Sequence, residues 1–517
     1  MAATIKWEPV LLMFLYVFPT CCLAQGKVNS EKMEFPSPVN NIIPKPVLVT
    51  LLNAGATIIS GTSFITADRL FRNQALYLRK QMENQCGLHL TVRRRLLKNR
   101  TGIMLRFNQT TVNNPEMYLL SITNNRVVIE ARDIEGVVHG IQTLLQLLPL
   151  TDTGLISLPS LTISDYPRFR YRGMHLDVSR HFFPVSFIKQ YIDYLTFYKF
   201  NSFHWHLTDD QGWRIEIKEY PKLTEVGAWR DSTLVGHFRD IPARFDGTPY
   251  GGFYTREEVK DIIKYASVRG ITIIPEIDIP GHSRAIIASY PELSTSPDTI
   301  FDVAANWGMY NRKNNVLAPN EKTFAFLKAV FGEIADLFPS TYIHVGGDEC
   351  SKIWWNADTA TQAFMKKHGL KNDTALQAYF IQQVIEDLKL KGKKVIGWDE
   401  ILEGDVDTSA IIMNWRGVKA AIRAVKEKHE VIMAPGAYTY FNYSQTRNED
   451  SLTAGGYLPL DKVYNFEPIP GGLNKEEAKY ILGAQGNVWT EYMTNFAKVE
   501  YMIFPRMTAI SEVLWTD

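Results

Sequence analysis

The hydrophobic pattern of this 517-residue chain becomes regular from about Phe169 onward. Short runs rich in β-branched and aromatic residues recur there, and most are followed by a segment with the 3.6-residue period of an amphipathic helix. The eight runs are Tyr171–Val178, Phe200–Leu207, Ile271–Ile277, Thr341–Val345, Lys394–Trp398, Ala410–Asn414, Glu430–Met433 and Leu482–Val488. Eight strands alternating with helices predict an α/β fold of the (β/α)8 barrel type.

Segments with helical periodicity lie between these runs. They are Pro184–Lys199, Arg256–Val268, Glu321–Phe338, Thr374–Leu390, Val418–Glu427 and Lys475–Tyr480, and one further helix is predicted over Lys498–Trp515. Thr255 and Glu258 have the spacing of a capping box at one helix start. An open doubly wound sheet is the competing arrangement, but we find no G-x-G-x-x-G fingerprint after a first strand.

The region before the barrel has a different pattern. It contains strand-like runs such as Pro46–Leu52 and Val127–Ala131, and helical stretches at Leu70–Met82 and Glu135–Leu147. These elements predict a small α+β domain without a catalytic constellation. We place it at residues 25–163 and the barrel domain at residues 164–517, joined near Ser164–Pro167.

The first 24 residues resemble a targeting segment. Val10–Phe18 is an apolar run too short to span a bilayer, and small residues end at Ala24. We expect a cleaved signal peptide and a secreted or periplasmic protein; a buried N-terminal strand is the alternative. Lipid attachment at Cys21 or Cys22 is not expected, because Phe18-Pro19-Thr20 suits it poorly. No later stretch reaches about 18 uninterrupted apolar residues, so no membrane span is predicted.

The composition of the chain narrows the classes of molecule that the protein is expected to bind. The chain has 56 Lys+Arg and 55 Asp+Glu, a formal net charge of +1, which argues against a protein that binds nucleic acid by neutralising phosphates. Aromatic residues make up 12% of the chain and include 11 Trp, enough to fill cores and to wall a site. Cys86 and Cys350 would remain after cleavage, and we expect both to stay thiols. No Cys/His cluster has metal-ligand spacing, so neither a metal nor a cofactor is predicted.

The predicted strands end in polar and aromatic residues. Active sites of such barrels lie at the carboxyl ends of the strands. The ends carry Asp177, Ser179 and Arg180; His204 to Asp210; Glu276, Asp278 and His282; His344 to Glu349; Trp398 to Glu400; Trp415 and Arg416; Tyr438, Tyr440 and Asn442; and Trp489 to Glu491. Sugars stack their C–H faces on aromatic rings and pair their hydroxyls with carboxylates and Arg. Strand ends are polar wherever they meet water, but a solvated rim rarely carries three Trp. We therefore predict a sugar site.

The adjacent carboxylates Asp348 and Glu349 carry the most information. Burying both raises the cost of ionising both, so one can be held protonated as a general acid. A usual retaining glycosidase places its two carboxylates on different strands, about 5–5.5 Å apart. Sequence neighbours point in different directions, which suits an acid beside a carboxylate that steadies a group of the substrate.

These residues resemble a known family. His344-Val345-Gly346-Gly347-Asp348-Glu349 looks like the H-x-G-G-D-E signature of glycoside hydrolase family 20, the β-N-acetylhexosaminidases. Further similar segments are Asp177–His181, Trp205–Trp213, Pro280–His282 and Trp489–Tyr492, and the resemblance covers Tyr171–Trp515. The preceding α+β domain also resembles the non-catalytic N-terminal domain of that family.

The resemblance implies a substrate-assisted, retaining reaction on a β-linked N-acetylglucosamine or N-acetylgalactosamine glycan. In it the 2-acetamido oxygen attacks the anomeric carbon and gives an oxazolinium intermediate. Glu349 would be the acid and then the base, and Asp348 would hold the acetamido N–H. The other implied roles are acetamido binding by Tyr440, walls from Trp398, Trp415 and Trp489, hydroxyl binding by Arg180 and Glu491, and a relay of Asp209 and His282 behind Glu349.

One position departs from the family pattern. Asn442 stands where the family usually has Asp, so it can bond a sugar hydroxyl but brings no charge. This leaves the gluco or galacto preference open. The main alternative function is a sugar-binding barrel of the same fold with altered or lost catalysis. A phosphate-binding isomerase would need a glycine-rich loop after strands seven and eight, where Gly436 and Gly486 are isolated.

Overall fold

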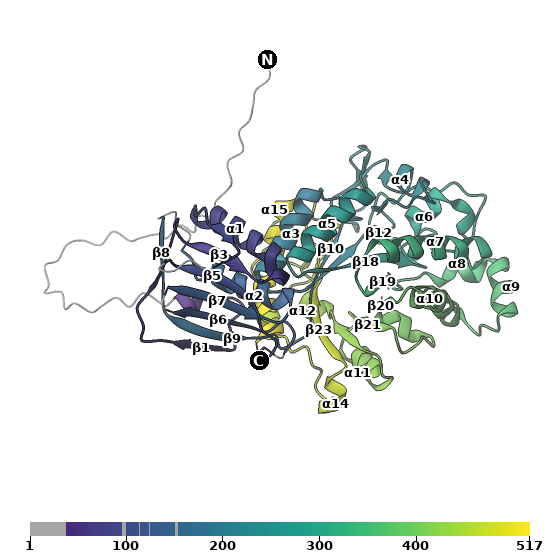
Figure 1. Cartoon of the computed structure of the whole chain (residues 1–517). Helices are drawn as coiled ribbons and strands as arrows, with labels where there is room; N and C mark the ends of the chain where they lie inside the picture. Colours follow the sequence, from purple (N-terminus) through teal and green to yellow (C-terminus); the bar gives the residue numbers. More distant parts are fainter. Residues whose placement is uncertain (1–37, 96–99, 113, 124, 150–153, 517) are drawn as a thin grey trace, which may run out of the picture.

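The structure is a computed structural model, and it describes residues 38–95, 100–112, 114–123, 125–149 and 154–516. Figure 1 shows a sheet-containing N-terminal domain beside a larger barrel. The expected signal peptide at residues 1–24 and its Cys21 and Cys22 lie outside the described residues. Among the described residues, no helix is both long and apolar enough to cross a membrane.

The N-terminal domain is built on a seven-stranded mixed sheet with the order β1-β9-β6-β7-β5-β3-β4. The strands are β1 (Leu48–Leu51), β3 (Phe64–Ala67), β4 (Thr91–Arg93), β5 (Gly102–Phe107), β6 (Tyr118–Thr123), β7 (Arg126–Ala131) and β9 (Leu161–Asp165), while β2 (Thr57–Ser60) pairs with β8 (Leu155–Leu158). Helices α1 (Arg72–Cys86) and α2 (Ile134–Gln146) lie between this sheet and the barrel helices (Figure 1). The predicted α+β domain is confirmed, and β9 ends two residues beyond the expected limit at residue 163.

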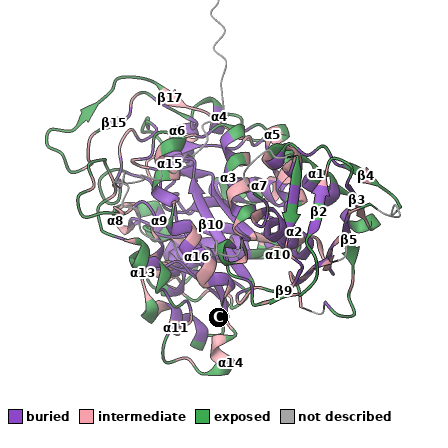
Figure 2. Ribbon diagram, turned by 90° about the vertical axis from the view of Figure 1, so that its left-hand side faces the viewer, coloured by how far each residue is buried: buried purple, intermediate pink, exposed green. Residues whose placement is uncertain are grey.

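The second domain is a closed parallel barrel of eight strands. In order around the barrel these are β10 (Tyr171–Asp177), β11 (Ser202–His206), β18 (Thr272–Ile279), β19 (Tyr342–Gly346), β20 (Lys394–Trp398), β21 (Ile411–Asn414), β22 (Val431–Met433) and β23 (Ile481–Gly486). Each coincides with a predicted run to within about two residues. In Figure 2 the barrel strand β10 is buried, inside helices whose outer faces are exposed. The predicted (β/α)8 barrel is confirmed.

The helices of the barrel follow the predicted segments with one exception. The long ones are α3 (Val185–Phe197), α5 (Arg256–Val268), α7 (Glu321–Leu337), α10 (Asp373–Leu390) and α11 (Val418–Lys426), with the short α14 (Lys475–Ala478) before β23. The capping box of Thr255 and Glu258 is present at the start of α5. The single helix predicted over Lys498–Trp515 is wrong: α15 (Phe496–Ile503) ends before Pro505 and α16 (Arg506–Trp515) begins after it. Proline lacks the N–H that a helix interior needs and its ring clashes with the preceding turn.

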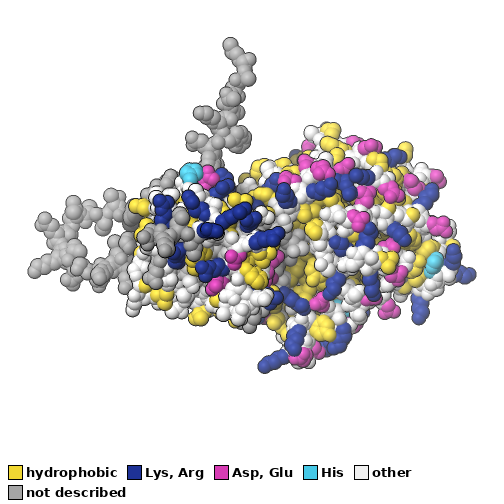
Figure 3. Space-filling model, viewed as in Figure 1, with side chains coloured by type: hydrophobic (Ala, Val, Ile, Leu, Met, Phe, Trp, Pro, Cys, Tyr) yellow, Lys and Arg dark blue, Asp and Glu magenta, His cyan; other side chains and the backbone are white. Residues whose placement is uncertain are grey.

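Shorter elements complete the barrel domain, and several occupy the long connections at its carboxyl end. They are β12 (Thr208–Asp209), β13 (Gly212–Trp213), β14 (Trp229–Arg230), β15 (Leu234–Val235), β16 (Arg244–Phe245), β17 (Tyr250–Gly251), α4 (Lys222–Glu225), α6 (Arg284–Ser289), α8 (Lys352–Ala357), α9 (Thr359–Lys367), α12 (Gly436–Thr439) and α13 (Leu460–Tyr464). Basic and acidic side chains are interspersed over the face in Figure 3, in keeping with the balanced charge.

A buried ion pair joins the two domains. The Nζ of Lys199, just after α3, lies 2.8 Å from Oδ2 of Asp165 at the end of β9, and both side chains are fully buried. Tyr118 donates its hydroxyl to Asp165 at 2.7 Å, and the Trp515 indole N–H donates to the same carboxylate at 2.8 Å. Trp515 on α16 thereby packs in the hydrophobic core of the N-terminal domain. The last helix of the barrel therefore holds the first domain in place.

We predict that Asp165→Asn lowers the free energy of unfolding by about 3–5 kcal/mol, because it leaves the Lys199 ammonium buried without a counter-charge. Urea denaturation measures the change. Asp261→Asn is the matched control, since it breaks the solvent-exposed Lys189–Asp261 pair, a type of pair worth about 0–1 kcal/mol. Equal losses in the two variants would contradict the prediction.

Candidate active site

A single cavity of about 290 Å³ collects most of the predicted site residues at the carboxyl end of the barrel. Those that line it are Arg180, Asp209, His282, Asp348, Glu349, Trp415, Tyr440, Asn442, Trp489 and Glu491. They come from the ends of most of the eight strands, which meet because parallel strands in a barrel all end at the same side.

The turn after β19 places the two carboxylates. Gly346 and Gly347 have φ values of 68° and 91°, in the left-handed region that favours glycine. A Cβ on Gly346 would stand 1.6 Å from Oδ1 of Asp278, so only glycine fits there. Glu349 itself has a φ of 41°, a strained backbone for a residue with a side chain and one that clusters at functional sites.

The turn places the side chains of Asp348 and Glu349 in different surroundings. The Asp348 side chain is 13% exposed and the Glu349 side chain 48%, so Glu349 faces the mouth of the cavity. His282 Nε2 lies between them, 3.7 Å from Oδ2 of Asp348 and 3.6 Å from Oε2 of Glu349. Adjacent in sequence, the two carboxylates point into different environments, as their neighbouring positions predicted.

The surroundings of the two carboxylates favour a proton on Asp348, not on Glu349, the residue expected to be the acid. Burial, together with the Glu349 charge, raises the pKa of Asp348 to about 6. A hydrogen bond and the charge of His282 lower the pKa of Glu349, although burial opposes the change. In the unliganded protein Asp348 is therefore the carboxyl that holds a proton more readily, whereas the family resemblance gives the acid role to Glu349.

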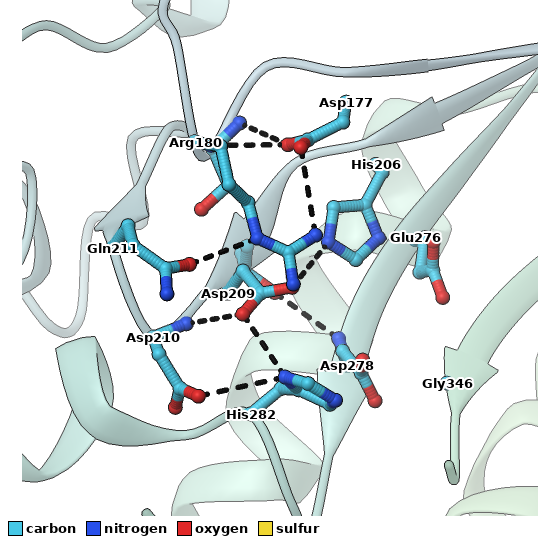
Figure 4. A network of polar contacts seen from close by, with 12 residues as sticks. Asp177, Arg180, His206, Asp209, Asp210, Gln211, Glu276, Asp278, His282 and Gly346 are labelled. Carbon is cyan, nitrogen blue, oxygen red and sulfur yellow. Dashed lines mark hydrogen bonds and ion pairs between the residues drawn. The ribbon is translucent and has the colours of Figure 1, made fainter. Parts of the chain in front are cut away.

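Behind the pair lies a buried polar chain, drawn in Figure 4. His282 Nδ1 lies 3.0 Å from Oδ1 of Asp209, and Arg180 pairs with the other oxygen of Asp209 at 2.8 Å. Arg180 and His282, with the hydrogen bonds to the carboxylate, hold the pKa of Asp209 well below its usual range despite burial. The predicted contact between Asp209 and His282 is thus present, with His282 reaching the carboxylate pair.

Aromatic rings form one wall of the cavity. Trp415 stacks on Tyr440 with ring centroids 6.2 Å apart, and Tyr440 lies 6.4 Å from Trp489. The Arg180 guanidinium lies over Trp489 at 5.1 Å. The wall is therefore made of flat apolar faces next to a cation, an arrangement suited to a sugar ring with its hydroxyls.

Trp398 is the one predicted site residue that does not line the cavity. It is 1% exposed, and its indole N–H donates to Glu276 at 2.9 Å inside the barrel. Its ring centroid lies 5.8 Å from that of Trp489. As the last residue of β20, its side chain points into the barrel interior, so Trp398 supports the wall from below.

Three oxygen atoms in the cavity lining are buried without a hydrogen-bond partner: Oδ1 of Asp348, Oδ1 of Asn442 and Oε2 of Glu491. A buried acceptor left unsatisfied costs about 1–3 kcal/mol. All three accept hydrogen bonds, so a ligand rich in O–H and N–H donors would satisfy them.

Several lining residues were missed by sequence reasoning. Phe238, Trp307, Met309, Tyr443 and Tyr492 also line the cavity. Phe238 and Trp307 come from long connections with no barrel periodicity, so no sequence signal marked them. Tyr492 directly follows the predicted Glu491, and that adjacency could have found it.

Glu400, which was identified from the sequence at a strand end but given no role, supports Trp415. Its Oε2 accepts the Trp415 indole N–H at 2.9 Å. Burial, with the charges of Asp348 and Asp399, raises the pKa of Glu400 to about 9. Glu400 therefore stays neutral near pH 7. The motif Trp398-Asp399-Glu400 was identified from the sequence, but the protonation state of Glu400 could not be predicted from it.

The sequence spacing predicted no metal site, yet the fold gathers His175, His204 and Glu276 so that their potential ligand atoms lie within 4.8 Å of one another. Both His204 nitrogens have neighbours in this cluster: Nε2 lies 3.0 Å from Glu276, and Nδ1 lies 3.0 Å from the Gln485 amide. Among the described residues three further groups of this kind lie near the cavity: His206, Asp209 and Asp278; Asp209, Asp210 and His282; and Asp278, His282 and Asp348.

Comparison with known proteins identifies the family. Residues 169–517 match the model of the glycosyl hydrolase family 20 catalytic domain, and residues 39–166 match domain 2 of that family. The chain belongs to glycosyl hydrolase family 20. It is therefore a glycoside hydrolase by family, as the signature around Asp348 and Glu349 predicted.

Similar proteins carry related names. The chain is 38% identical to a β-hexosaminidase of Porphyromonas gingivalis, over 96% of this chain and 64% of that protein, and 36% identical to one of Vibrio furnissii, over 98% and 81%. Among solved structures it is similar to an exo β-N-acetylglucosaminidase of Vibrio harveyi in complex with N-acetylglucosamine. That match has a TM-score of 0.82 and 34% identity, and covers 93% of this chain and 74% of that one. The chain thus spans slightly less than two thirds of the Porphyromonas protein.

We predict that Glu400→Gln makes the protein more stable at high pH relative to the unchanged protein. Folded Glu400 keeps a proton that the unfolded chain releases above its ordinary range, so stability falls as pH rises between the ordinary value and about 9. The gain of the variant should grow by roughly 1–3 kcal/mol between about pH 5 and about pH 8, measured by urea denaturation.

Glu403→Gln is the control for that experiment, because Glu403 is 43% exposed and pairs with Arg416 outside the cavity. It should show no growing gain. Parallel stability curves for the unchanged protein and Glu400→Gln would refute a buried neutral Glu400.

Proposed function

We propose that this chain is an exo-acting β-N-acetylhexosaminidase that removes terminal non-reducing N-acetylhexosamine residues from chitooligosaccharides or glycoconjugates, with retention. The observation that carries the proposal is the cavity itself: two unlike carboxylates, an aromatic wall and unsatisfied acceptors face one space. The names of the similar proteins support the N-acetylhexosamine specificity.

The size of the cavity supports exo action. Its volume of about 290 Å³ is at the lower end of the usual range for small-ligand pockets, about 300–1,000 Å³. Phe238 and Trp307 line it from the connections outside the barrel. Such a pocket suits one terminal sugar ring, whereas cleavage inside a polysaccharide needs an open groove.

In the proposed reaction the substrate's acetamido oxygen attacks the anomeric carbon, and Glu349 gives a proton to the leaving oxygen. The exposed position of Glu349 at the mouth places it toward the leaving group. Asp348 accepts the acetamido N–H, which favours its ionised form, because a donor to a carboxylate stabilises the negative charge. The coupled pair then holds its proton on Glu349, where exclusion of water by the bound sugar also favours the neutral carboxyl. Glu349 afterwards acts as base toward water.

The remaining predicted residues have parts in the same scheme. Tyr440 bonds the acetamido oxygen, and burial together with the Asp348 charge raises the pKa of its hydroxyl, so it stays a donor. Arg180, Glu491 and Asn442 bond ring hydroxyls, and Trp415 and Trp489 contact the sugar faces. Asp209 and His282 tune the proton affinity of Glu349.

We further propose export of the protein through a cleaved signal peptide at residues 1–24, to the periplasm or the outside of the cell. The apolar run Val10–Phe18 supports this. Chitin fragments or glycoconjugates outside the cytoplasm are then its accessible substrates.

We expect Glu349→Gln to lower kcat on an aryl N-acetyl-β-glucosaminide by about 10²–10⁴-fold, the usual contribution of a general acid. Asp348→Asn should cripple turnover to a similar extent, although Asp348 is not the acid, because the amide cannot stabilise the developing positive charge. Steady-state rates of the two variants are measured beside Glu403→Gln, which should remain active. A near-normal rate for either site variant would remove the role assigned to that residue.

The requirements for the acetamido group and for the sugar epimer are tested with three aryl substrates: the N-acetyl-β-glucosaminide, the N-acetyl-β-galactosaminide and the plain β-glucoside. We expect turnover of one or both acetamido sugars and none of the glucoside, because the nucleophile is part of the acetamido group. The ratio of the first two rates gives the preference between the epimers. Asn442→Asp should change that ratio, and the change measures the effect of Asn442. Hydrolysis of the plain glucoside would contradict substrate assistance. The same lack of turnover on all three would instead favour the alternative, a sugar-binding barrel with lost catalysis.

A further inference from the structure

A second histidine, His206, lies one step deeper than His282 in the buried polar chain (Figure 4). It ends β11 and is fully buried. Its Nδ1 bonds Oε2 of Glu276, and its Nε2 lies 2.8 Å from Oδ2 of Asp209. A neutral imidazole donates from only one nitrogen. Because each ring nitrogen faces a carboxylate oxygen, the geometry calls for an imidazolium that donates at both ends.

The other contacts of the two carboxylates agree with this charge state. Glu276 also accepts from the Trp398 indole, and His204 Nε2 lies 3.0 Å from it. Asp209 also binds Arg180 and His282. Both carboxylates are surrounded by donors, which stabilise their ionised forms, so neither supplies a proton that would relieve His206 of its charge.

The groups that face His206 from neighbouring strands include both anions and neutral imidazoles. Glu276 on β18 and Asp209 on β12 are anions; burial opposes the charged imidazole, but these two carboxylates raise the pKa of His206 to about 10. Two further imidazoles lie near it: His204 on the same strand, and His175 on β10, whose ring centroid is 5.6 Å from that of His206. Burial lowers the pKa of His204 to about 4 and that of His175 still further from its usual value. Arg180 binds Oδ2 of Asp209 at 2.8 Å, the same oxygen that His206 Nε2 contacts.

His206 also contacts the aromatic wall of the cavity. Its ring stands edge-on to the Trp489 indole at 4.9 Å, while the Arg180 guanidinium lies over the same indole at 5.1 Å. Two cations thus contact one indole of the cavity, and both also bind Asp209. A substitution of His206 would therefore alter contacts with both the aromatic wall and the buried polar chain.

We propose that His206 is a positioning residue for the reaction: as a buried imidazolium it joins Glu276 at the centre of the barrel to the Asp209–His282 pair, and so sets the proton affinity of His282 and Glu349. This inference rests on the function proposed above. It extends the expected contact of Asp209 and His282 by two residues, His206 and Glu276, that do not themselves line the cavity.

The direction of the effect follows from the charge. Replacing His206 by a neutral side chain removes a positive charge behind Asp209. His282 and Glu349 then hold their protons more strongly, so both titrate at higher pH. The alkaline limb of the pH profile of kcat/KM should move to higher pH by about one unit, with a fall in its maximum of about 10–100-fold.

The test compares His206→Gln with the unchanged protein on an aryl N-acetyl-β-glucosaminide across the pH range. Glutamine can donate from its amide NH2 group but carries no charge. His429→Gln is the matched control: His429 is also buried, bonds a backbone carbonyl and lies outside the cavity. A moved alkaline limb in His206→Gln alone supports the proposal. Loss of activity with both limbs unchanged would overturn it in favour of a merely structural histidine.

A second measurement does not depend on activity. In protein labelled with ¹⁵N-histidine, the signals lost in His206→Gln identify the His206 ring, and we expect both nitrogens to be protonated from about pH 5 to about pH 8. In Glu276→Gln a doubly protonated ring signal should be replaced by one that titrates within that range, which tests the proposal without an assignment from His206→Gln. A His206 ring with one proton at neutral pH would overturn the proposal. If the unchanged protein hydrolyses no acetamido sugar, the proposed function fails, and the NMR titration of His282 in His206→Gln still decides whether the two rings are coupled.

Discussion

The carboxyl end of this barrel depends on the pairing of buried charges. Asp209 and Glu276 lie where water does not reach, and an isolated carboxylate there would cost several kcal/mol. Arg180, His206 and His282 offset that cost by hydrogen bonds at 2.8–3.0 Å and by their charges. Arg180, His206 and His282 all contact Asp209, so the side chains of the cavity lining and those behind it belong to one network of buried charges.

The glycine pair at the end of β19, Gly346 and Gly347, provides the second constraint. Asp278 stands so close to Gly346 that no side chain fits, and the left-handed backbone that follows turns Glu349 toward the mouth while Asp348 stays inside. The same two residues in an extended strand would point to opposite faces of the sheet. The proposed division of labour between an assisting carboxylate and an acid therefore originates in backbone geometry, before any difference in proton affinity.

Much of the fold was predictable, because its signals are local. Most barrel strands are short runs rich in apolar residues, as expected of parallel strands that are covered on both faces, although β10 and β11 also carry buried polar residues such as Arg172 and His204. The failure at Lys498–Trp515 came from reading periodicity across Pro505, where the missing N–H decided the outcome. Trp398 shows the other kind of limit: its place at a strand end was correct, but whether a ring enters the cavity or packs below it depends on the Glu276 carboxylate from another strand.

The sequence by itself determined the eight-stranded barrel, the α+β domain before it, the adjacent carboxylates and most residues around the cavity, because these follow from local periodicity and from motifs that lie within a few residues. Only the tertiary structure decided the protonation preferences of Asp348 and Glu349, the neutral Glu400, the rim residues Phe238 and Trp307, and the charged His206. These properties arise from burial and from charges on different strands, and the distances between strands cannot be read from any one segment of the chain.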